Sequence, residues 1–281
     1  MAEVSKEMIM ELRQMTGAGM MDCKRALQET GGDLEAAVDL LRKKGAATSA
    51  KKALREAKEG VIAAHILPGS RVGVLVEVNC ETDFVARNEM FRQFADKVAQ
   101  TLAENPEADL EPMRTEIVGA IRENIQIPRH VRFEAPENAL VAAYIHTGGK
   151  VGVLVEIGAG KTETIENPAF KELVKNITLQ IAAASPLVVK REELDPQIVE
   201  RERKVILESD LVKNKPPQAV ERIVAGKMEK FYQTVCLLDQ GYVKRNSEIS
   251  VAEYIAEVEK ELSDKVEVRR FVRYQVGEAS S

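Results

Sequence analysis

Apolar residues in the first 45 positions recur every three or four residues, which is the spacing of amphipathic helices. Ser5 can cap a first helix, and the Thr16-Gly17-Ala18-Gly19 segment ends it. A second helix is predicted from about Met21 to Thr30, and a third from a cap at Asp33 to Gly45. Such a small bundle buries little surface, so we expect a docking module rather than a site for chemistry. The residues expected to face its interior are Met8, Ile9, Leu12, Met15, Ala26, Leu27, Leu34, Ala37, Val38, Leu40 and Leu41.

The middle of the chain contains an internal repeat. Residues 72–78 read VGVLVEV and residues 151–157 read VGVLVEI, an offset of 79 residues. Each copy is predicted to form a hairpin closed by a Gly turn, followed by a loop and an amphipathic helix. Two strands followed by a helix, repeated, indicate two related α+β subdomains with antiparallel sheets rather than a doubly wound parallel sheet. The same offset relates Ala63 to Ala142, Ile66 to Ile145, Gly69 to Gly148, Asn88 to Asn167 and Phe91 to Phe170.

The last third of the chain changes to long helical patterns. Asp195-Pro196 can cap a helix with a heptad ridge at Ile198, Val205 and Val212, thickened by its neighbours Val199 and Ile206. The Asn214-Lys215-Pro216-Pro217 segment breaks it, and a second helix follows with alternating spacings of three and four. We expect a helical hairpin that projects as a coiled-coil arm over about residues 190–238. A further helix is predicted near 251–262, and then a strand over 266–276.

Composition narrows the class of protein. The chain has 281 residues, more than one compact core usually holds, and 40 Lys and Arg against 45 Asp and Glu. A net charge of -5 and the absence of Trp argue against a protein that coats or stacks on nucleic acid. Three distant Cys, no apolar leader and no long apolar run favour a reducing cytoplasm and argue against membrane insertion. Residues 42–58 are locally basic; this pattern indicates a solvated linker helix or, less often, a surface for an acidic partner.

Motifs for chemistry are weak. Gly158-Ala159-Gly160-Lys161-Thr162 follows a strand, but a phosphate-binding loop needs Gly where this chain has Val155. His65, His130 and His146 lack the spacing of metal ligands. Cys80 has Asp83 nearby, yet a buried structural Cys is the more common outcome than a nucleophile. We therefore expect no catalytic residue, cofactor or metal, and no enzyme.

One loop differs between the two copies. Residues 80–88 read CETDFVARN, whereas residues 159–167 read AGKTETIEN. A duplicated fold needs similar loops for structure alone, so Asp83 and Phe84 in one copy indicate a role outside the fold. The alternative is that Phe84 covers its own helix as a core residue, and the usual burial of Phe favours this alternative on the pattern alone.

Two segments resemble the signature regions of bacterial elongation factor Ts, a family of nucleotide exchange factors for elongation factor Tu. They are LRQMTGAGMMDCKRAL at 12–27 and VEVNCETDFVARN at 76–88, and the resemblance covers essentially the whole chain. It implies a ubiquitin-associated-like three-helix domain with a basic linker over 1–54, a core N-subdomain over 55–140, and a core C-subdomain with the arm over 141–281. Arg122 stands where some relatives have Gly, and a further C-terminal helix of other members has no counterpart after Glu278.

The resemblance also implies a function. The Asp-Phe pair of the family is inserted into the G domain of elongation factor Tu, disturbs its Mg²⁺ and phosphate site and promotes GDP release during translation elongation. The partner is bound in GDP-bound and nucleotide-free states, without direct contact to nucleic acid or membrane. An alternative is a non-catalytic ubiquitin-associated-like binding scaffold, in which residues 1–45 carry most of the affinity. By position, the loop residues are Thr82, Asp83, Phe84 and Val85, and the other partner contacts are Arg13, Met20, Met21, Lys52, Ile121 and His146.

Overall fold

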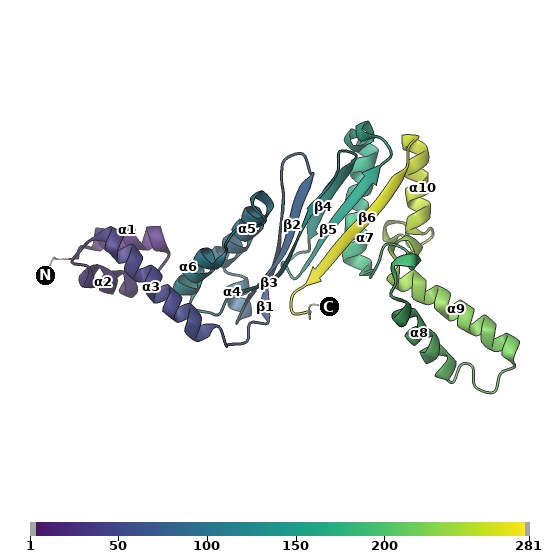
Figure 1. Cartoon of the computed structure of the whole chain (residues 1–281), viewed down its shortest axis with the longest axis horizontal. Coiled ribbons are helices and arrows are strands. Elements are labelled where there is room, and N and C mark those ends of the chain that lie inside the picture. Colours follow the sequence, from purple (N-terminus) through teal and green to yellow (C-terminus); the bar gives the residue numbers. More distant parts are fainter. Residues whose placement is uncertain (1–3, 279–281) are drawn as a thin grey trace.

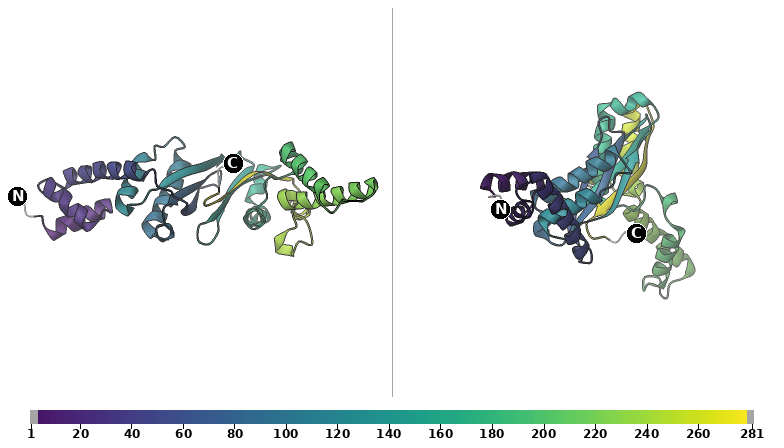
Figure 2. Two further views of the ribbon diagram at one scale, coloured as in Figure 1. Left: turned by 90° about the horizontal axis from the view of Figure 1, so that it is seen from below. Right: turned by 60° about the vertical axis from the view of Figure 1, so that its left-hand side comes forward.

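The chain forms an elongated molecule with a helical domain at one end, two sheets in the middle and a helical hairpin at the other end (Figure 1). Two further views show the same order of parts (Figure 2). The computed structural model describes residues 4–278; inside the third helix, the side chains of residues 46 and 48–51 lie outside the described part. The α+β class with an N-terminal three-helix unit is confirmed.

The N-terminal domain contains α1 (Lys6–Thr16), α2 (Met20–Glu29) and α3 (Leu34–Lys52). The first helix begins and ends as predicted, because Ser5 Oγ accepts a hydrogen bond from the Met8 backbone N–H at 3.2 Å and Gly17 ends α1 with φ of 63°. Met15 is an exception, because it is 57% exposed and lines a cleft towards the core. The buried residues of this domain are Leu12, Ala18, Cys23, Ala26, Leu27 and Ala37.

The third helix does not end at Gly45, as predicted, but continues to Lys52. Gly45 is buried where α3 crosses α6 (Glu111–Ile121). A Cβ at Gly45 would lie 3.3 Å from the Thr115 carbonyl oxygen and 3.9 Å from Gly119 Cα. The missing side chain therefore permits close helix contact instead of ending the helix. The extension carries part of the basic stretch to the core; the Lys51 side chain lies outside the described residues.

Two three-stranded antiparallel sheets form the core. The strand order is β1-β2-β3 in the first sheet and β4-β5-β6 in the second, so β2 and β5 are the central strands. Helices α5 and α6 cover the outer face of the first sheet, and α7 and α10 cover that of the second. The inner faces pack on one another through a shared apolar cluster that includes Ile62, Leu75, Val141 and Leu154. The bounds are β1 (Glu59–Ile66), β2 (Val72–Cys80), β3 (Gln126–Glu134), β4 (Ala139–Ile145), β5 (Val151–Ala159), β6 (Val266–Gln275), α5 (Glu89–Glu104), α7 (Pro168–Ala184) and α10 (Val251–Leu262).

The contacts between the sheets confirm the duplication. The Ile62 N–H donates to the Gly149 carbonyl at 2.7 Å, and the Val141 N–H donates to the Ser70 carbonyl at 2.7 Å. Each bond becomes the other when 79 residues are added to the first copy and subtracted from the second. The two subdomains are therefore related by a pseudo-twofold axis through the interface between the sheets.

The third strand is also duplicated, but its offset changes to 141 residues, so the constant offset of 79 does not reveal it. Arg129 donates to the buried carboxylate of Glu77 at 2.7 Å, and Arg270 donates to that of Glu156 at 2.7 Å. Arg129 and Arg270 differ by 141 positions, whereas the two carboxylates differ by 79. The arm and its neighbouring segments are inserted between α7 and β6, which lengthens the second copy and hides the repeat.

The arm consists of α8 (Pro196–Glu208) and α9 (Pro217–Val235), which form a hairpin that projects from the core (Figure 1). The predicted ridge is wrong at Ile198 and Val205, which are 42% and 56% exposed. Val212 is buried but follows the helix, and the neighbours predicted to thicken the ridge, Val199 and Ile206, are the ones that pack. On α8, the residues that pack against α9 lie one position after the predicted ridge residues. The coiled-coil character of the arm stays a prediction. Its packed residues are Val199, Ile206, Val220, Val224, Met228, Phe231 and Tyr232. Short 3-10 turns are η2 (Arg191–Glu193), η3 (Leu237–Asp239) and η4 (Val243–Arg245).

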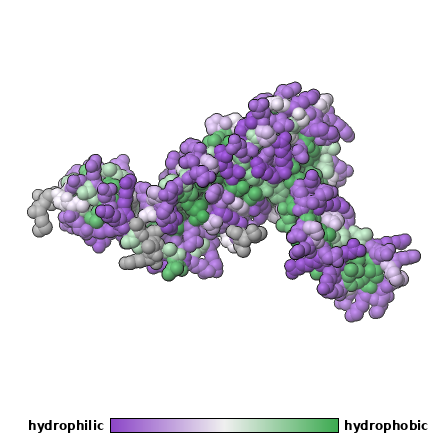
Figure 3. Space-filling model, in the orientation of Figure 1, coloured by the Kyte–Doolittle hydropathy of each residue, from purple (hydrophilic) through white to green (hydrophobic). Residues whose placement is uncertain are grey.

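The outer surface of the arm is mostly hydrophilic in the view of Figure 3, with a small hydrophobic area near its middle. Across residues 4–278, we find no helix with the length and apolar character needed to cross a bilayer.

Candidate partner-binding loop

The loop between β2 and α5 has a defined local structure. Thr82 caps the one-turn helix α4 (Asp83–Ala86), since its hydroxyl oxygen accepts from the Val85 N–H at 3.3 Å. Asn88 then caps α5, because its side-chain oxygen accepts from the Met90 N–H at 2.8 Å. Two caps thus fix the loop at its beginning and at its end.

The side chain of Phe84 points into solvent. It is 80% exposed, whereas Ala86 is buried and Val85 packs against the first core cluster. Successive residues of a helix are turned by about 100° from one another, so the inward position of Val85 and Ala86 directs Phe84 outward. The alternative that Phe84 is a core residue is therefore wrong. An exposed aromatic side chain on a capped turn is typical of a binding contact.

Asp83 is available for a partner as well. Its carboxylate lies 3.0 Å from the Arg87 guanidinium, four residues further along; Arg87 is largely exposed and Asp83 about half-exposed. Exposed ion pairs of this kind contribute little, about 0.2–1 kcal/mol. A partner can therefore replace Arg87 at small cost.

The second copy has the same frame without the aromatic residue. Its loop forms the 3-10 turn η1 (Thr162–Glu166), and Glu163 stands at the position 79 residues after Phe84. Here Thr164 and Ile165 are buried, and they pack the turn against its own sheet. Only the first copy therefore offers a protruding apolar side chain at this place.

The other predicted contacts lie on the helices of the N-terminal domain, on α6 and in the turn after β4. Arg13, Met20 and Met21 are exposed on the N-terminal domain, with Met20 47% and Met21 62% exposed. Lys52 and Ile121 are half-buried at the ends of α3 and α6. His146 is exposed after β4 and shares a 3.1 Å hydrogen bond with the Tyr144 hydroxyl.

The turn after His146 lies at the same end of the core as Phe84. Lys150, in that turn, is 2.5 Å from the Glu59 carboxylate, and Glu59 pairs in register with Cys80 at the start of the loop. The N-terminal domain approaches the same region, because a Cβ at Gly17 would lie 3.4 Å from Met90 in the first turn of α5. The turn after His146 and the Gly17 end of the N-terminal domain therefore lie on the side of the core that carries the loop, and the contacts themselves stay a prediction.

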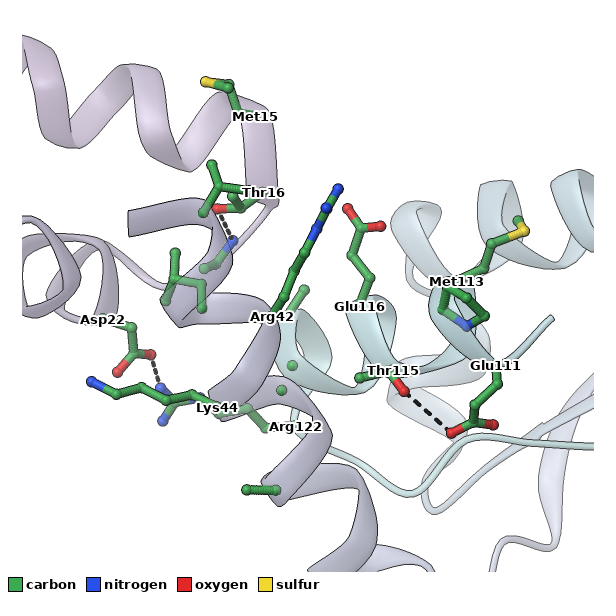
Figure 4. A pocket seen from close by; sticks show the side chains of 18 of the residues that line it. Met15, Thr16, Asp22, Arg42, Lys44, Glu111, Met113, Thr115, Glu116 and Arg122 are labelled. Carbon is green, nitrogen blue, oxygen red and sulfur yellow. Dashed lines mark hydrogen bonds and ion pairs between the residues drawn. The ribbon is translucent and has the colours of Figure 1, made fainter. Parts of the chain in front are cut away.

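A cleft of about 1150 Å³ lies between the N-terminal domain and α6, beside the point where α3 crosses α6 (Figure 4). An ion pair between Asp22 and Arg122 bridges it, and Arg42 and Glu116 point towards one another across it. Arg122 has φ of 66°, a left-handed conformation that Gly adopts more easily. The Arg at this position therefore supplies a cross-domain contact at some conformational cost.

Comparison with known proteins identifies this arrangement. The profile of a family described as Elongation factor TS matches residues 81–278, and the profile of the UBA/TS-N domain matches residues 4–41. The chain belongs to the elongation factor Ts family. The elongation factor Ts of Lawsonia intracellularis is 42% identical, with 98% of this chain and 99% of that protein covered. That of Symbiobacterium thermophilum is 45% identical over 99% of this chain and 93% of that protein.

Two residues outside the loop of this elongation factor Ts family member, Glu123 and Asn124, hydrogen-bond to it from the segment after α6 and were not predicted from the sequence. A signal for Glu123 lies in the third-strand repeat, because Glu123 and Asp264 differ by 141 positions and each precedes the third strand of its sheet. Only the changed offset could have revealed Glu123, and the sequence carries no such signal for Asn124.

In this elongation factor Ts family member, side chains of the protein itself contact the segment that resembles a phosphate-binding loop, residues 158–162. The Lys161 N–H donates to the Asp264 carboxylate at 2.9 Å, and Arg269 fills the space over Gly158. A phosphate would have to displace both groups. We expect Lys161→Ala to leave the exchange activity proposed below within about twofold of the wild type, because surface substitutions rarely have large effects. A stopped-flow measurement of GDP release checks this; a large loss would return the segment to consideration as a site.

The three Cys residues are buried and unpaired. Burial, followed by the nearby Glu123, raises the pKa of Cys80 to about 12, and burial, followed by Asp239, raises the pKa of Cys236 to about 11. Burial also raises the pKa of Cys23. Because the thiolate is the nucleophile, we expect none of them to react with an aromatic disulfide reagent at pH 8 until the protein unfolds. Rapid labelling of one thiol per native chain would contradict this.

Among the described residues, no group of His, Cys, Asp and Glu has the arrangement of a metal site.

Proposed function

We propose that this chain is the guanine nucleotide exchange factor of elongation factor Tu and promotes GDP release during translation elongation. Membership of the elongation factor Ts family over nearly the full length supports this function. The observation that carries it is Phe84, an 80% exposed aromatic residue on a doubly capped turn that has no counterpart in the second subdomain.

The mechanism follows from what Mg²⁺ and a diphosphate require. Mg²⁺ demands near-ideal octahedral oxygen ligation and neutralises the GDP phosphates. A small displacement of the elements of elongation factor Tu that support the ion therefore weakens the binding of both Mg²⁺ and GDP. Phe84 enters an apolar pocket of the partner as an anchor. Asp83 exchanges Arg87 for hydrogen-bond donors of the partner, or repels the anions of the nucleotide site. Thr82 and Val85 flank Asp83 and Phe84 and fix their turn, Thr82 by capping it and Val85 by packing against the core.

Exchange results from differential affinity, and no covalent bond changes. The factor binds nucleotide-free partner more tightly than GDP-bound partner, and by linkage it must weaken GDP binding by the same factor. Returning GTP then expels it. We place this cycle in the cytoplasm, without nucleic acid or membrane contact by this chain.

The remaining surface supplies affinity. The N-terminal domain, over residues 1–54, docks on the partner with Arg13, Met20, Met21 and Lys52, because exposed Met side chains adapt to a partner surface. Ile121 and His146 contact the partner from the two core subdomains, 55–140 and 141–281. The scaffold alternative would need only the N-terminal domain, whereas the similarity to relatives continues through the core and arm.

A direct test measures release of a fluorescent GDP from purified elongation factor Tu by stopped flow, with this chain at one hundredth of the partner concentration. We expect each molecule to release many GDP molecules when excess unlabelled nucleotide is present. Excess Mg²⁺ should slow the accelerated release, because the ion opposes the displaced state. A release rate that stays at the level of elongation factor Tu alone would refute the proposed function.

A further inference from the structure

Glu123 lies beneath the Phe84 loop and binds it with both carboxylate oxygens. Its Oε2 accepts hydrogen bonds from the backbone N–H groups of Glu81 at 2.9 Å and Thr82 at 3.0 Å. Its Oε1 accepts from the Thr82 hydroxyl at 2.7 Å. The same hydroxyl oxygen caps α4 by accepting from Val85, so Glu123 acts directly on the cap that orients Phe84.

A bond in the opposite direction closes this connection. Glu81 Oε1 accepts from the Asn124 backbone N–H at 2.6 Å, so the segments 81–82 and 123–124 bind one another reciprocally. Asn124 is buried, and its side-chain nitrogen donates to the Arg55 carbonyl at 2.6 Å. The loop is therefore attached to two segments that are distant in sequence. Hydrogen bonds to a charged acceptor are the stronger kind, so these contacts restrict the loop effectively.

The second subdomain repeats the arrangement with Asp264. Its Oδ2 accepts from the Lys161 backbone N–H at 2.9 Å and from the Thr164 hydroxyl at 2.6 Å. The hydrogen bond from Thr164 is the main reason why the pKa of Asp264 is lowered. A carboxylate before the third strand thus fixes the equivalent loop in both copies, but only one of these loops carries an exposed aromatic residue.

We propose that Glu123 is a positioning residue for exchange: it holds the Asp83–Phe84 turn in its projecting conformation before the partner arrives. This inference rests on the proposed function. A loop that must be ordered during association lowers affinity by the cost of ordering it, whereas a loop that is already ordered avoids this cost. Loss of Glu123 therefore weakens binding of the partner more than it slows GDP release from the bound complex.

The test compares Glu123→Ala, Glu123→Gln and Asp264→Ala in the full chain. Stimulated GDP release is measured over a range of concentrations of each variant. We expect Glu123→Ala to raise the concentration for half-maximal stimulation about tenfold or more, the scale of losing charge-assisted hydrogen bonds. Its maximal rate should stay within about threefold of the wild type, because Phe84 is still present. Glu123→Gln keeps an acceptor oxygen and should restore most of the affinity.

Asp264→Ala is the matched control, because it removes the equivalent carboxylate from the loop without an aromatic residue. We expect it to lower the unfolding midpoint in urea about as much as Glu123→Ala, and to leave the concentration dependence of exchange unchanged. If Glu123→Ala does not fold, Glu123→Asp replaces it in the same titration, since it keeps the charge and shortens the reach. Equal effects of the Glu123 and Asp264 variants on exchange, or no effect of Glu123→Ala, would overturn the inference.

Hydrogen exchange of the free protein gives a second measurement that needs no partner. The amides of Glu81 and Thr82 should lose at least tenfold protection in Glu123→Ala, while those of the β5 strand keep theirs. Unchanged protection of both amides would also overturn the inference. If wild-type protein fails to stimulate GDP release but these amides behave as expected, the proposed function is wrong and the structural part of the inference stands.

Discussion

Replacing Phe84 by Ala is expected to slow stimulated GDP release strongly. The expected loss is about 2–4 kcal/mol in the free energy of activation or of partner binding, the scale of an aromatic hot spot. The ring is 80% exposed in the free protein, so its removal takes almost no packing from the fold. It would, however, remove the side chain that fills the pocket of the partner. Stopped-flow release of fluorescent GDP and urea unfolding of the same variant separate the two effects: the first should change strongly and the second hardly at all.

Glu163→Ala is the matched control for Phe84→Ala, because Glu163 occupies the equivalent position of the second copy and is also exposed. We expect this variant to retain the wild-type exchange rate. An unchanged rate with Phe84→Ala would remove Phe84 from the mechanism. A loss of unfolding free energy as large as the loss of exchange would instead show that the ring supports the fold.

The repeat of hairpin and helix could be predicted because its offset is constant and its residues are local. Strand alternation, Gly turns and caps act within a few residues, and these signals gave the right elements from Glu59 to Cys80 and from Ala139 to Ala159. The third strand could not be found in the same way, because the insertion of the arm changes its offset. The ridge of the arm failed for a related reason: Val199 and Ile206 are spaced like Ile198 and Val205, and only the partner helix decides which pair is buried.

The loop shows the limit of local patterns most clearly. The residues of the loop are unusual in one copy, and this could be read from the sequence. The direction of Phe84 could not, because it depends on Thr82 and on a carboxylate about forty positions later, Glu123. The predicted end of the third helix at Gly45 is wrong for a similar reason. A Gly in a helical pattern suggests the end of the helix, whereas here α6 crosses α3 at Gly45 and needs the space that a side chain would fill. In each case a distant contact determines what the local residues do.

Gly60→Ala is expected to destabilise the fold by about 3–5 kcal/mol, the largest effect among our stability predictions. Gly60 pairs with Asn79 in the first sheet and has φ of 153°, a conformation that side-chain-bearing residues rarely adopt. An added Cβ would also overlap the carbonyl oxygen of Val78 and lie 2.8 Å from Asn79 Cα. Both neighbours are backbone atoms of the central strand, so neither can move without disturbing the ladder that leads into the Phe84 loop.

The second copy provides the control for this prediction, because the residue 79 positions later is Ala139, which pairs with Gly158. The small residue is on the opposite strand there, and Arg269 occupies the space that a side chain at Gly158 would need. Ala139→Gly should therefore cost about 1–2 kcal/mol, through backbone entropy and the loss of a fully buried methyl group. Urea unfolding followed by circular dichroism measures both variants. A cost of Gly60→Ala that does not exceed that of Ala139→Gly would show that the strand adapts, and that the two halves tolerate side chains at this pair alike.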